Sequence, residues 1–208
     1  MKKTLVTGSK GLVGSMINAD IKISREYNLM DINQVDSMFD THNPQYVINC
    51  AAKVGGIGAN MNNMATYFYE NLMISTNIIE SARRNNVEKL INFSSTCIFP
   101  DKVEYPLTED KIHLGPPHET NYGYGYAKRV ADIQIKTYNQ QYGTKYFSVI
   151  PCNIYGPNDN YNIENSHVIP SLIHKVYLAK IKNEDIVVWG TGKPLREFIY
   201  SKDVGEIS

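Results

Sequence analysis

Four apolar stretches of strand length alternate with stretches of helical periodicity in the first three quarters of this 208-residue chain. The strand-like stretches are TLVTG (4–8), YVINCAA (46–52), LINFSS (90–95) and the start of YFSVIPCNIYG (146–156). Patterns typical of helices, over 63–86 and 126–142, separate the last three. Buried strands that alternate with helices pair in parallel through right-handed crossovers. The sequence therefore predicts an α/β fold with a doubly wound parallel sheet of the Rossmann type.

The composition changes at residue 157, where the stretch PNDN marks a loop. Beyond it the sequence predicts a helix over 168–181, short strands over 186–189 and 196–200, and the first turn of another helix at DVGEIS. We therefore predict a dinucleotide-binding domain over 1–156 and part of a substrate-binding domain over 157–208. Because the chain stops inside an element, the second domain is expected to be incomplete.

Charge and cysteine usage argue against several classes of protein. The 21 basic and 21 acidic residues balance, and no long basic run stands out, so nothing indicates nucleic acid or an anionic membrane surface. The three cysteines, at 50, 97 and 152, form no C-x-x-C pair, so neither a metal site nor a disulfide framework is expected. The N-terminal MKKTLVTGS is too short for a signal-peptide core, and a cytosolic protein is expected.

A glycine-rich loop follows the first predicted strand. TLVTGSKGLVGS places Gly8, Gly11 and Gly14 at three-residue spacing. Such glycines permit a tight turn and close backbone approach to a pyrophosphate, and a following helix would offer its N-terminal N–H groups to the phosphates. The loop therefore predicts dinucleotide binding, and a turn chosen for packing alone is the alternative.

The segment after this loop is shorter than a strand–helix–strand unit requires. Only SMINADIKISREYNLMD lies between the loop and Asp31, so either the first helix or the second strand must be curtailed. The choice between NAD and NADP stays open for the same reason. Lys10, Lys22 and Arg25 could meet a 2′-phosphate or remain solvated surface charges. Lys10, inside the loop, is the preferred candidate.

The stretch NYGYGYAKR offers three tyrosines as acid–base groups. Tyr124 lies four residues before Lys128, so both face one way on a helix, whereas Tyr126 points elsewhere and Tyr122 falls before the predicted helix. At about 4 Å and an effective dielectric of about 20, an ammonium attracts a phenolate by about 4 kcal/mol before desolvation. The spacing thus predicts that Lys128 lowers the pKa of Tyr124 toward a range useful for catalysis.

FSSTCIFP (93–100) adds hydroxyl groups at the carboxyl end of a predicted strand, the edge at which doubly wound sheets form their ligand crevice. Ser95 there would polarise a carbonyl oxygen, while Ser94 is expected to make hydrogen bonds at the strand end. Together with the glycine loop, Tyr124 and Lys128, it would supply the parts for hydride transfer to a carbonyl.

The order of these motifs resembles that of the extended short-chain dehydrogenase/reductase family. The order is TGxxGxxG, AAKVGG, SSTCIFP, Y-x-x-x-K, PCNIYGP and NSHVIP. AAKVGGI, STCIFPDK, SHVIPSLIHK and VVWGTGKPLREFIY are similar to the GDP-L-fucose synthase branch of that family. The resemblance runs from residue 3 to the last residue with a gap around 17–27. It implies NADPH-dependent conversion of GDP-4-keto-6-deoxy-D-mannose to GDP-L-fucose, by C3/C5 epimerisation and C4 reduction, in a homodimer that pairs through the helices near 63–86 and 126–142.

The same resemblance implies roles for individual residues. The reductase set would be Ser95, Tyr124 and Lys128, and the epimerase pair Cys97 and His167. Cofactor contacts would come from Gly8, Lys10, Gly11, Leu12, Gly14, Asn28, Leu29, Ala51, Ala52, Tyr124 and Lys128. GDP-sugar contacts would come from Asn153, His167, Lys175, Trp189 and Arg196. Without the resemblance, Cys97 is typical of a small buried apolar residue, His167 of a surface or capping histidine, Trp189 of a core residue and Arg196 of a surface charge.

Two departures from the family pattern leave alternatives open. The curtailed 17–27 region affects the adenosine side of the cofactor site. The chain also ends where family members continue, so a further basic contact to the nucleotide is expected to be missing. One alternative is a truncated, non-catalytic relative that binds nucleotide. Another is a different NAD(P)-dependent nucleotide-sugar epimerase or reductase, although Cys97 and His167 argue against a plain reductase.

Overall fold

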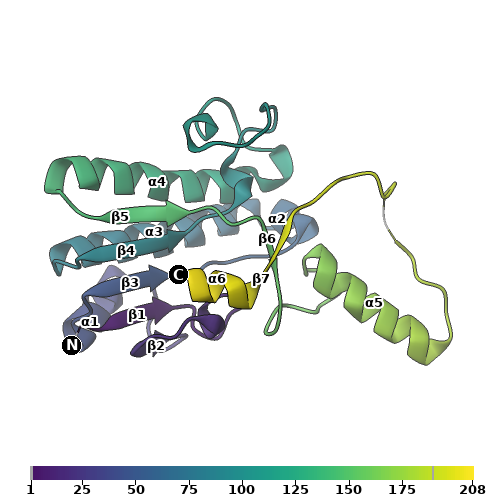
Figure 1. Cartoon of the computed structure of the whole chain (residues 1–208), viewed down its shortest axis with the longest axis horizontal. Coiled ribbons are helices and arrows are strands. Elements are labelled where there is room, and N and C mark those ends of the chain that lie inside the picture. The colour runs from purple at the N-terminus through teal and green to yellow at the C-terminus, as the bar shows by residue number, and fades with distance from the viewer. Residues whose placement is uncertain (1, 189) are drawn as a thin grey trace.

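The computed structural model describes residues 2–188 and 190–208, and its centre is a parallel sheet (Figure 1). Five strands pair in the order β2-β1-β3-β4-β5. They are β1 (Thr4–Thr7), β2 (Ile21–Ile23), β3 (Tyr46–Asn49), β4 (Lys89–Phe93) and β5 (Tyr146–Val149). The predicted doubly wound α/β fold is confirmed. The strand order reverses between β1 and β3, which is where such sheets open a crevice beyond their carboxyl ends.

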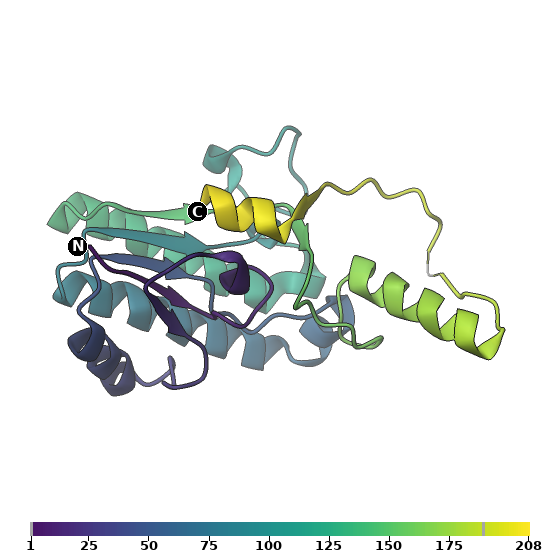
Figure 2. The ribbon, with the colours of Figure 1, turned by 60° about the horizontal axis from the view of Figure 1, so that its bottom comes forward.

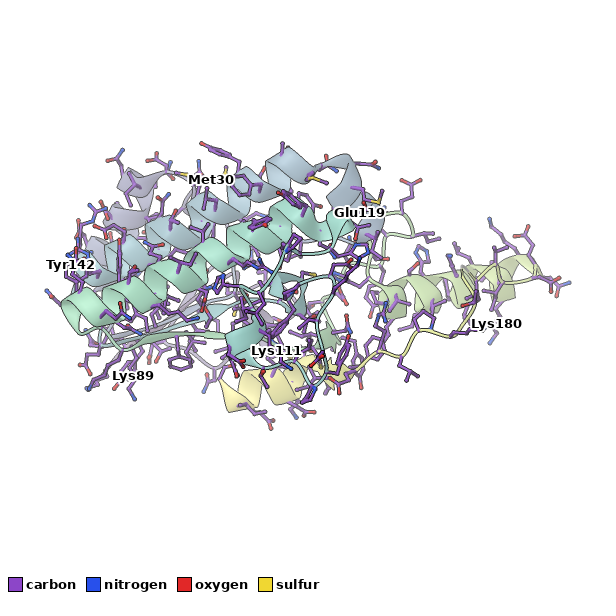
Figure 3. The ribbon with its side chains drawn as sticks, turned by 90° about the horizontal axis from the view of Figure 1, so that it is seen from above. Met30, Lys89, Lys111, Glu119, Tyr142 and Lys180 are labelled. Atoms are coloured by element: carbon purple, nitrogen blue, oxygen red, sulfur yellow. The ribbon has the colours of Figure 1, made fainter. Side chains whose placement is uncertain are left out.

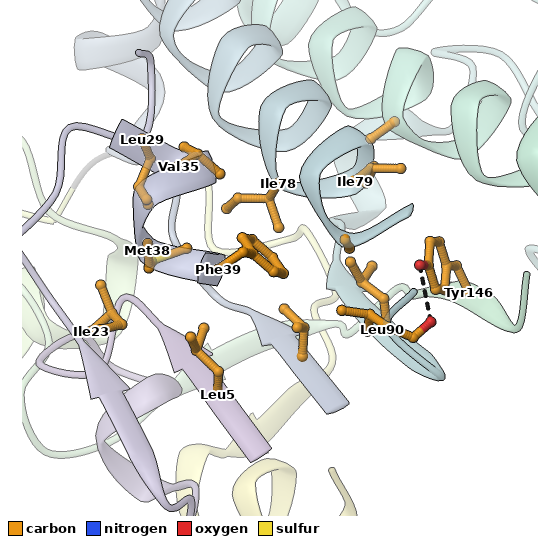
Figure 4. Packing of buried hydrophobic residues seen from close by; sticks show 14 of the residues in the cluster. Leu5, Ile23, Leu29, Val35, Met38, Phe39, Ile78, Ile79, Leu90 and Tyr146 are labelled. Carbon is orange, nitrogen blue, oxygen red and sulfur yellow. Dashed lines mark hydrogen bonds between the residues drawn. The ribbon is translucent and has the colours of Figure 1, made fainter. Parts of the chain in front are cut away.

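Three long helices cover one face of the sheet. They are α1 (Ile32–His42), α3 (Met64–Arg84) and α4 (Tyr122–Tyr142), and the short α2 (Ile57–Asn62) precedes α3. Helices α3 and α4 run side by side along this face (Figures 1 and 3). Figure 4 shows the core beneath them, where Leu5 and Leu90 of the sheet meet Phe39 of α1 and Ile78 of α3. These side chains are at most 1% exposed, so this layer holds the strand ends in place.

The opposite face is covered by much shorter elements. Helix α6 (Ser201–Ile207) lies there, on the other side of the sheet from α1 and α3 (Figure 2). The three-residue 3₁₀ helix η1 (Gly14–Met16) packs against it, since a Cβ on Gly205 would lie 2.7 Å from the Met16 Cβ. Val204 of α6 joins Val6 and Ile48 of the sheet in a second core. The predicted boundary at 156/157 stays a prediction, and α6 packs on the first five strands.

The helix expected after the glycine loop is absent from the described chain, because η1 takes its place. Residues 17–20, between η1 and β2, do not continue the helix, because the backbone is already extended at Ile17. Both the helix and the second strand are therefore short, which confirms the predicted curtailment, and a three-residue 3₁₀ helix stands where the phosphate-binding helix was expected. Asp31, at the end of this segment, caps α1 by accepting a hydrogen bond from Asn33 N at 3.0 Å.

Helix α4 begins at Tyr122, four residues before its predicted start, so the placement of Tyr122 before the helix is wrong. Gly123 and Gly125 are poor helix formers, but both lie where α4 touches its neighbours. A Cβ on Gly123 would lie 2.5 Å from Met64 O of α3, and one on Gly125 would lie 2.6 Å from Cys97 O. Tertiary packing thus extends the helix through both glycines.

Most of the helices and strands predicted for the last quarter of the chain are present in the structure. Helix α5 (Val168–Lys182) agrees with the helix predicted over 168–181, and β7 (Phe198–Tyr200) pairs with β6 (Asn153–Tyr155) in a small parallel sheet. The strand predicted over 186–189 is wrong for 186–188, which are irregular, and Trp189 lies outside the described residues. Helix α5 lies apart from the central sheet (Figures 1 and 3). Nowhere in the described chain is a helix both long and apolar enough to span a bilayer.

Candidate active site

The glycine loop after β1 is a compact turn with no room for side chains. Gly8 adopts φ +67°, and its added Cβ would lie 2.9 Å from Ala51 N. Gly14 folds back so closely that its Cβ would lie 2.4 Å from Gly8 O, while Gly11 N donates to the same oxygen at 2.9 Å. The backbone of the loop is therefore not covered by side chains where it passes Ala51, at the point between β1 and β3 where the strand order reverses. This arrangement fits the pyrophosphate of a dinucleotide, which needs close backbone approach.

A row of polar side chains fixes the strand ends beneath this loop. Thr7 Oγ1 donates to Asn49 Oδ1 at 2.7 Å, and Asn49 Nδ2 donates to Asn92 Oδ1 at 2.8 Å. Ala51 N lies 3.3 Å from both Thr7 Oγ1 and Asn49 Oδ1. All three side chains are at most 1% exposed. This hydrogen-bonded row was not predicted from the sequence, where its signal is one polar residue near the end of each of these apolar strands.

The other residues predicted to contact the cofactor differ in their solvent exposure. Leu29 is 7% exposed within the main core, and its carbonyl accepts a hydrogen bond from Asn77 Nδ2 at 3.1 Å. Asn28 is exposed, and its amide oxygen accepts from Met30 N at 3.1 Å. Lys10 is exposed, while Leu12 and Ala52 are half-buried. The roles of all of these residues toward the cofactor stay predictions.

Ser95 lies at the centre of the predicted catalytic group. It caps the 3₁₀ helix η2 (Thr96–Ile98), where Cys97 N donates to Ser95 Oγ at 3.3 Å. The Ser95 hydroxyl also interacts by hydrogen bonding with the side chains of Cys97 and Tyr124, and this interaction lowers the pKa of each. Burial has the larger effect and raises both pKa values above their ordinary range. In the free protein the thiol and the phenol are therefore protonated at neutral pH.

Lys128 lies beside Tyr124 on α4, as the four-residue spacing predicts. Its ammonium nitrogen is 5.9 Å from the Tyr124 ring centroid and donates to Phe93 O at 2.8 Å. Burial lowers the pKa of Lys128 to about 8, so the group is mostly charged at neutral pH. The prediction that Lys128 lowers the pKa of Tyr124 is wrong for the free protein, because both side chains are buried and desolvation dominates.

The two other tyrosines of the stretch face away from this group. Tyr122 and Tyr126 pack edge to face with ring centroids 4.8 Å apart, and Arg129 lies 5.3 Å from the Tyr126 ring. Tyr122 is 49% exposed, whereas Tyr124 is 9% exposed. Of the three, Tyr124 alone lies with Ser95 and Cys97.

His167 comes from a different part of the fold. It is exposed at the start of α5 as the cap residue, and its carbonyl accepts from Ser171 N at 3.1 Å. The preceding segment is held against the loop after β3, where Gly56 N donates to Asn165 O at 3.0 Å. Asp159 lies nearby: burial raises the pKa of its carboxyl group, and the charge of His167 opposes that rise. Among the described residues, no hydrogen bond links His167 to Ser95, Cys97 or Tyr124.

The predicted GDP-sugar contacts are spread over an open region. Asn153 Nδ2 donates to Glu197 O at 2.9 Å, and Lys175 Nζ lies 3.3 Å from Val187 O. Arg196 is exposed and bonds to Leu195 O at 2.8 Å. Trp189 lies outside the described residues. Whether these residues bind a sugar nucleotide stays a prediction.

Comparison with known proteins identifies the family of this chain. The model of the NAD dependent epimerase/dehydratase family matches residues 4–208. This chain belongs to that family. It is 46% identical over 217 residues to a GDP-L-fucose synthase of Dictyostelium discoideum, covering 99% of this chain and 68% of that relative. It is 39% identical over 219 residues to the GDP-L-fucose synthase of Escherichia coli (strain K12), covering 100% of this chain and 68% of that relative.

A solved structure extends the similarity to three dimensions. A GDP-L-fucose synthetase from Naegleria fowleri bound to NADP superposes with a TM-score of 0.89 at 39% identity. The match covers 99% of this chain and 71% of that one. The resemblance inferred from the motifs is thereby confirmed over nearly the whole chain.

Proposed function

We propose that this chain converts GDP-4-keto-6-deoxy-D-mannose to GDP-L-fucose with NADPH, by epimerisation at C3 and C5 and reduction at C4. The observation that carries the proposal is that Ser95 joins the Cys97 thiol and the Tyr124 phenol in one partly buried group. A thiol suits proton transfer at carbon, and a phenol suits protonation of a carbonyl oxygen. The relatives named GDP-L-fucose synthases support this reaction.

Epimerisation uses the acidity of C–H bonds next to the C4 carbonyl. Cys97, as thiolate, takes the proton from C3 or C5, and the electron pair of that bond moves onto the C4 oxygen. The hydroxyl groups of Ser95 and Tyr124 stabilise this oxygen by hydrogen bonding. His167, as imidazolium, returns a proton to the opposite face of the same carbon, which restores the carbonyl with inverted configuration.

Reduction uses the same oxygen-binding groups. Bound NADPH supplies the hydride to C4, and the glycine loop and Ala51 would hold its pyrophosphate. Tyr124 passes its hydroxyl proton to the C4 oxygen, and the pKa raised by burial keeps that proton on the phenol at neutral pH until the transfer. The Lys128 ammonium then stabilises the phenolate that remains. Protonation thus completes the alcohol without any solvent acid.

The direct test incubates the purified chain with NADPH and GDP-4-keto-6-deoxy-D-mannose. NADPH oxidation and GDP-L-fucose, identified by NMR, are the expected results. Neither signal appearing would contradict the proposal for this chain. Calorimetry then examines the non-catalytic alternative, for which tight NADPH binding without GDP-sugar binding is the expected outcome.

The two half-reactions are expected to depend on pH in opposite directions. The pKa of Lys128 is lowered to about 8, so its ammonium is lost as pH rises through 8. Reduction should fall about tenfold per pH unit above that value. The pKa of Cys97 is raised above its ordinary value of 9.0, so its thiolate is still increasing at pH 9. Proton exchange at C3 and C5 should therefore increase through this range.

Each half-reaction has its own readout. Deuterium incorporation at C3 and C5 without NADPH reports exchange, and NADPH oxidation by the Cys97→Ser variant reports reduction alone. A common pH optimum for both would contradict the assignment of separate groups to the two steps.

We infer that the chain forms a homodimer through α3 and α4. These helices lie side by side on the outer surface, where Phe68, Tyr69 and Ile133 are 38%, 57% and 50% exposed. Apolar side chains at such exposure suit a self-complementary helix interface. Light scattering should give twice the mass of the chain, and Ile133→Asp should give the single mass. A monomer for the unaltered chain would contradict this inference.

We also infer a cytosolic enzyme. All three cysteines are free, and reduced thiols, including the proposed catalytic Cys97, persist in that compartment.

A further inference from the structure

Two neighbouring cations of α4 hold the two ends of the segment that carries the catalytic serine and cysteine. Lys128 Nζ donates to Phe93 O at 2.8 Å, before Ser95. Arg129 Nε donates to Ile98 O at 2.6 Å, directly after Cys97. The sequence pattern predicts a role for the lysine and none for the arginine. The short segment between these two carbonyls contains both reacting side chains.

Arg129 is buried at 4% exposure, and within the described chain no carboxylate pairs with it. A buried cation without a counter-charge is costly unless its N–H groups are hydrogen-bonded. Two of its three nitrogens donate to backbone carbonyls, Nε to Ile98 O and Nη1 to Gly115 O at 2.7 Å, whereas Nη2 has no hydrogen-bond partner among the described residues. Because both acceptors belong to the main chain, this guanidinium fixes backbone position rather than neutralising an acid.

The bond to Ile98 O acts on η2 at a point where α4 is already in contact with it. Gly125, one turn earlier on α4, approaches so closely that its Cβ would lie 2.6 Å from Cys97 O. The bond to Gly115 O ties the returning end of the 99–117 loop to the same guanidinium. That loop is closed beside it by Asp101 N, which donates to Pro116 O at 2.9 Å. Arg129 thus joins α4, η2 and the loop at one point.

We propose that Arg129 is a positioning residue for Cys97, holding η2 so that the thiol stays beside Ser95 and Tyr124. The epimerisation part of this proposal rests on the proposed function, whereas the positioning part does not. Removing the guanidinium would leave Ile98 O and Gly115 O without their donor, and the end of η2 would be free to move. The thiol would then gain solvent access and lose its fixed place beside the C4 oxygen.

The test compares Arg129→Met and Arg129→Lys with the unaltered chain. Lys136→Met, which removes an exposed cation of the same helix, is the matched control. Iodoacetamide labelling between pH 6 and 10, quantified for each cysteine by mass spectrometry, reports thiol accessibility and its titration. Cys50, which is half-buried, near Lys128 and outside η2, serves as the internal reference.

In Arg129→Met, labelling of Cys97 should accelerate about tenfold relative to Cys50, as expected for the loss of the charged hydrogen bond that holds the end of η2 at Ile98 O. Its labelling should also begin at lower pH as burial is relieved. Deuterium incorporation at C3 and C5 should fall by a similar factor. Arg129→Lys, which can keep one carbonyl bond, should lie between, and Lys136→Met should match the unaltered chain.

Equal acceleration of Cys97 and Cys50 would overturn the proposal, because it would show general loosening of the fold. No change at Cys97 in either variant would overturn it as well. If the unaltered chain makes no GDP-L-fucose but Cys97 labelling changes selectively, the proposed function fails and the positioning role stands.

Discussion

Replacing Tyr124 by phenylalanine is expected to lower the rate of carbonyl reduction by about 10²- to 10⁴-fold, the usual contribution of a positioned proton donor. The change removes one hydroxyl and keeps the ring, which is 9% exposed and packed within α4 and its neighbours. The C4 oxygen would then lack the group that protonates it, while Lys128 and the glycine loop remain in place. Single-turnover oxidation of NADPH measures this loss directly.

Tyr122→Phe is the matched control for this substitution. Tyr122 lies on the same helix but is 49% exposed and packs on Tyr126, away from Ser95. Its loss of a hydroxyl should change the reduction rate less than about twofold, as is usual for an exposed surface position. Calorimetry should give similar NADPH affinity for both variants. Reduction retained in Tyr124→Phe would refute its assignment as the proton donor.

The sequence alone could identify Tyr124 as the tyrosine that lies beside Lys128, because this depends only on local helix geometry. Residues four apart face one way on any helix, so the position of Lys128 singles out Tyr124 wherever α4 begins. The residue at which α4 begins could not be predicted from the sequence. Gly123 and Gly125 argue against a helix by propensity, and only their contacts with Met64 O and Cys97 O explain why the helix includes them.

The hydrogen-bonded row at the strand ends could not be predicted from the sequence, because it too depends on tertiary contacts. Thr7, Asn49 and Asn92 form one hydrogen-bonded row only because β1, β3 and β4 lie next to one another in register. The direction of the Tyr124 pKa also required the fold. Its proximity to Lys128 follows from spacing, but the burial that outweighs the lysine depends on what packs around α4.

Cys97→Ser is expected to abolish epimerisation while sparing reduction. A serine hydroxyl is a far weaker acid than a thiol, so at accessible pH it cannot supply the base that removes a proton from C3 or C5. Deuterium incorporation at these carbons should fall by about 10²- to 10⁴-fold, the range for loss of a general base. Serine is close to cysteine in size and keeps the backbone N–H that donates to Ser95 Oγ. The turn that holds Ser95 beside Tyr124 should therefore persist.

The product distinguishes the two steps in this variant. Ser95, Tyr124 and Lys128 are unchanged, so NADPH should still be oxidised, and NMR should show a C4-reduced GDP-sugar with the original configuration at C3 and C5. Cys152→Ser is the control, because Cys152 follows β5 and lies near Glu197, outside η2. It should still form GDP-L-fucose. Exchange at C3 and C5 that survives in Cys97→Ser would mean that another group is the base, since the thiol is the one acid–base group that this change removes from the cluster around Ser95.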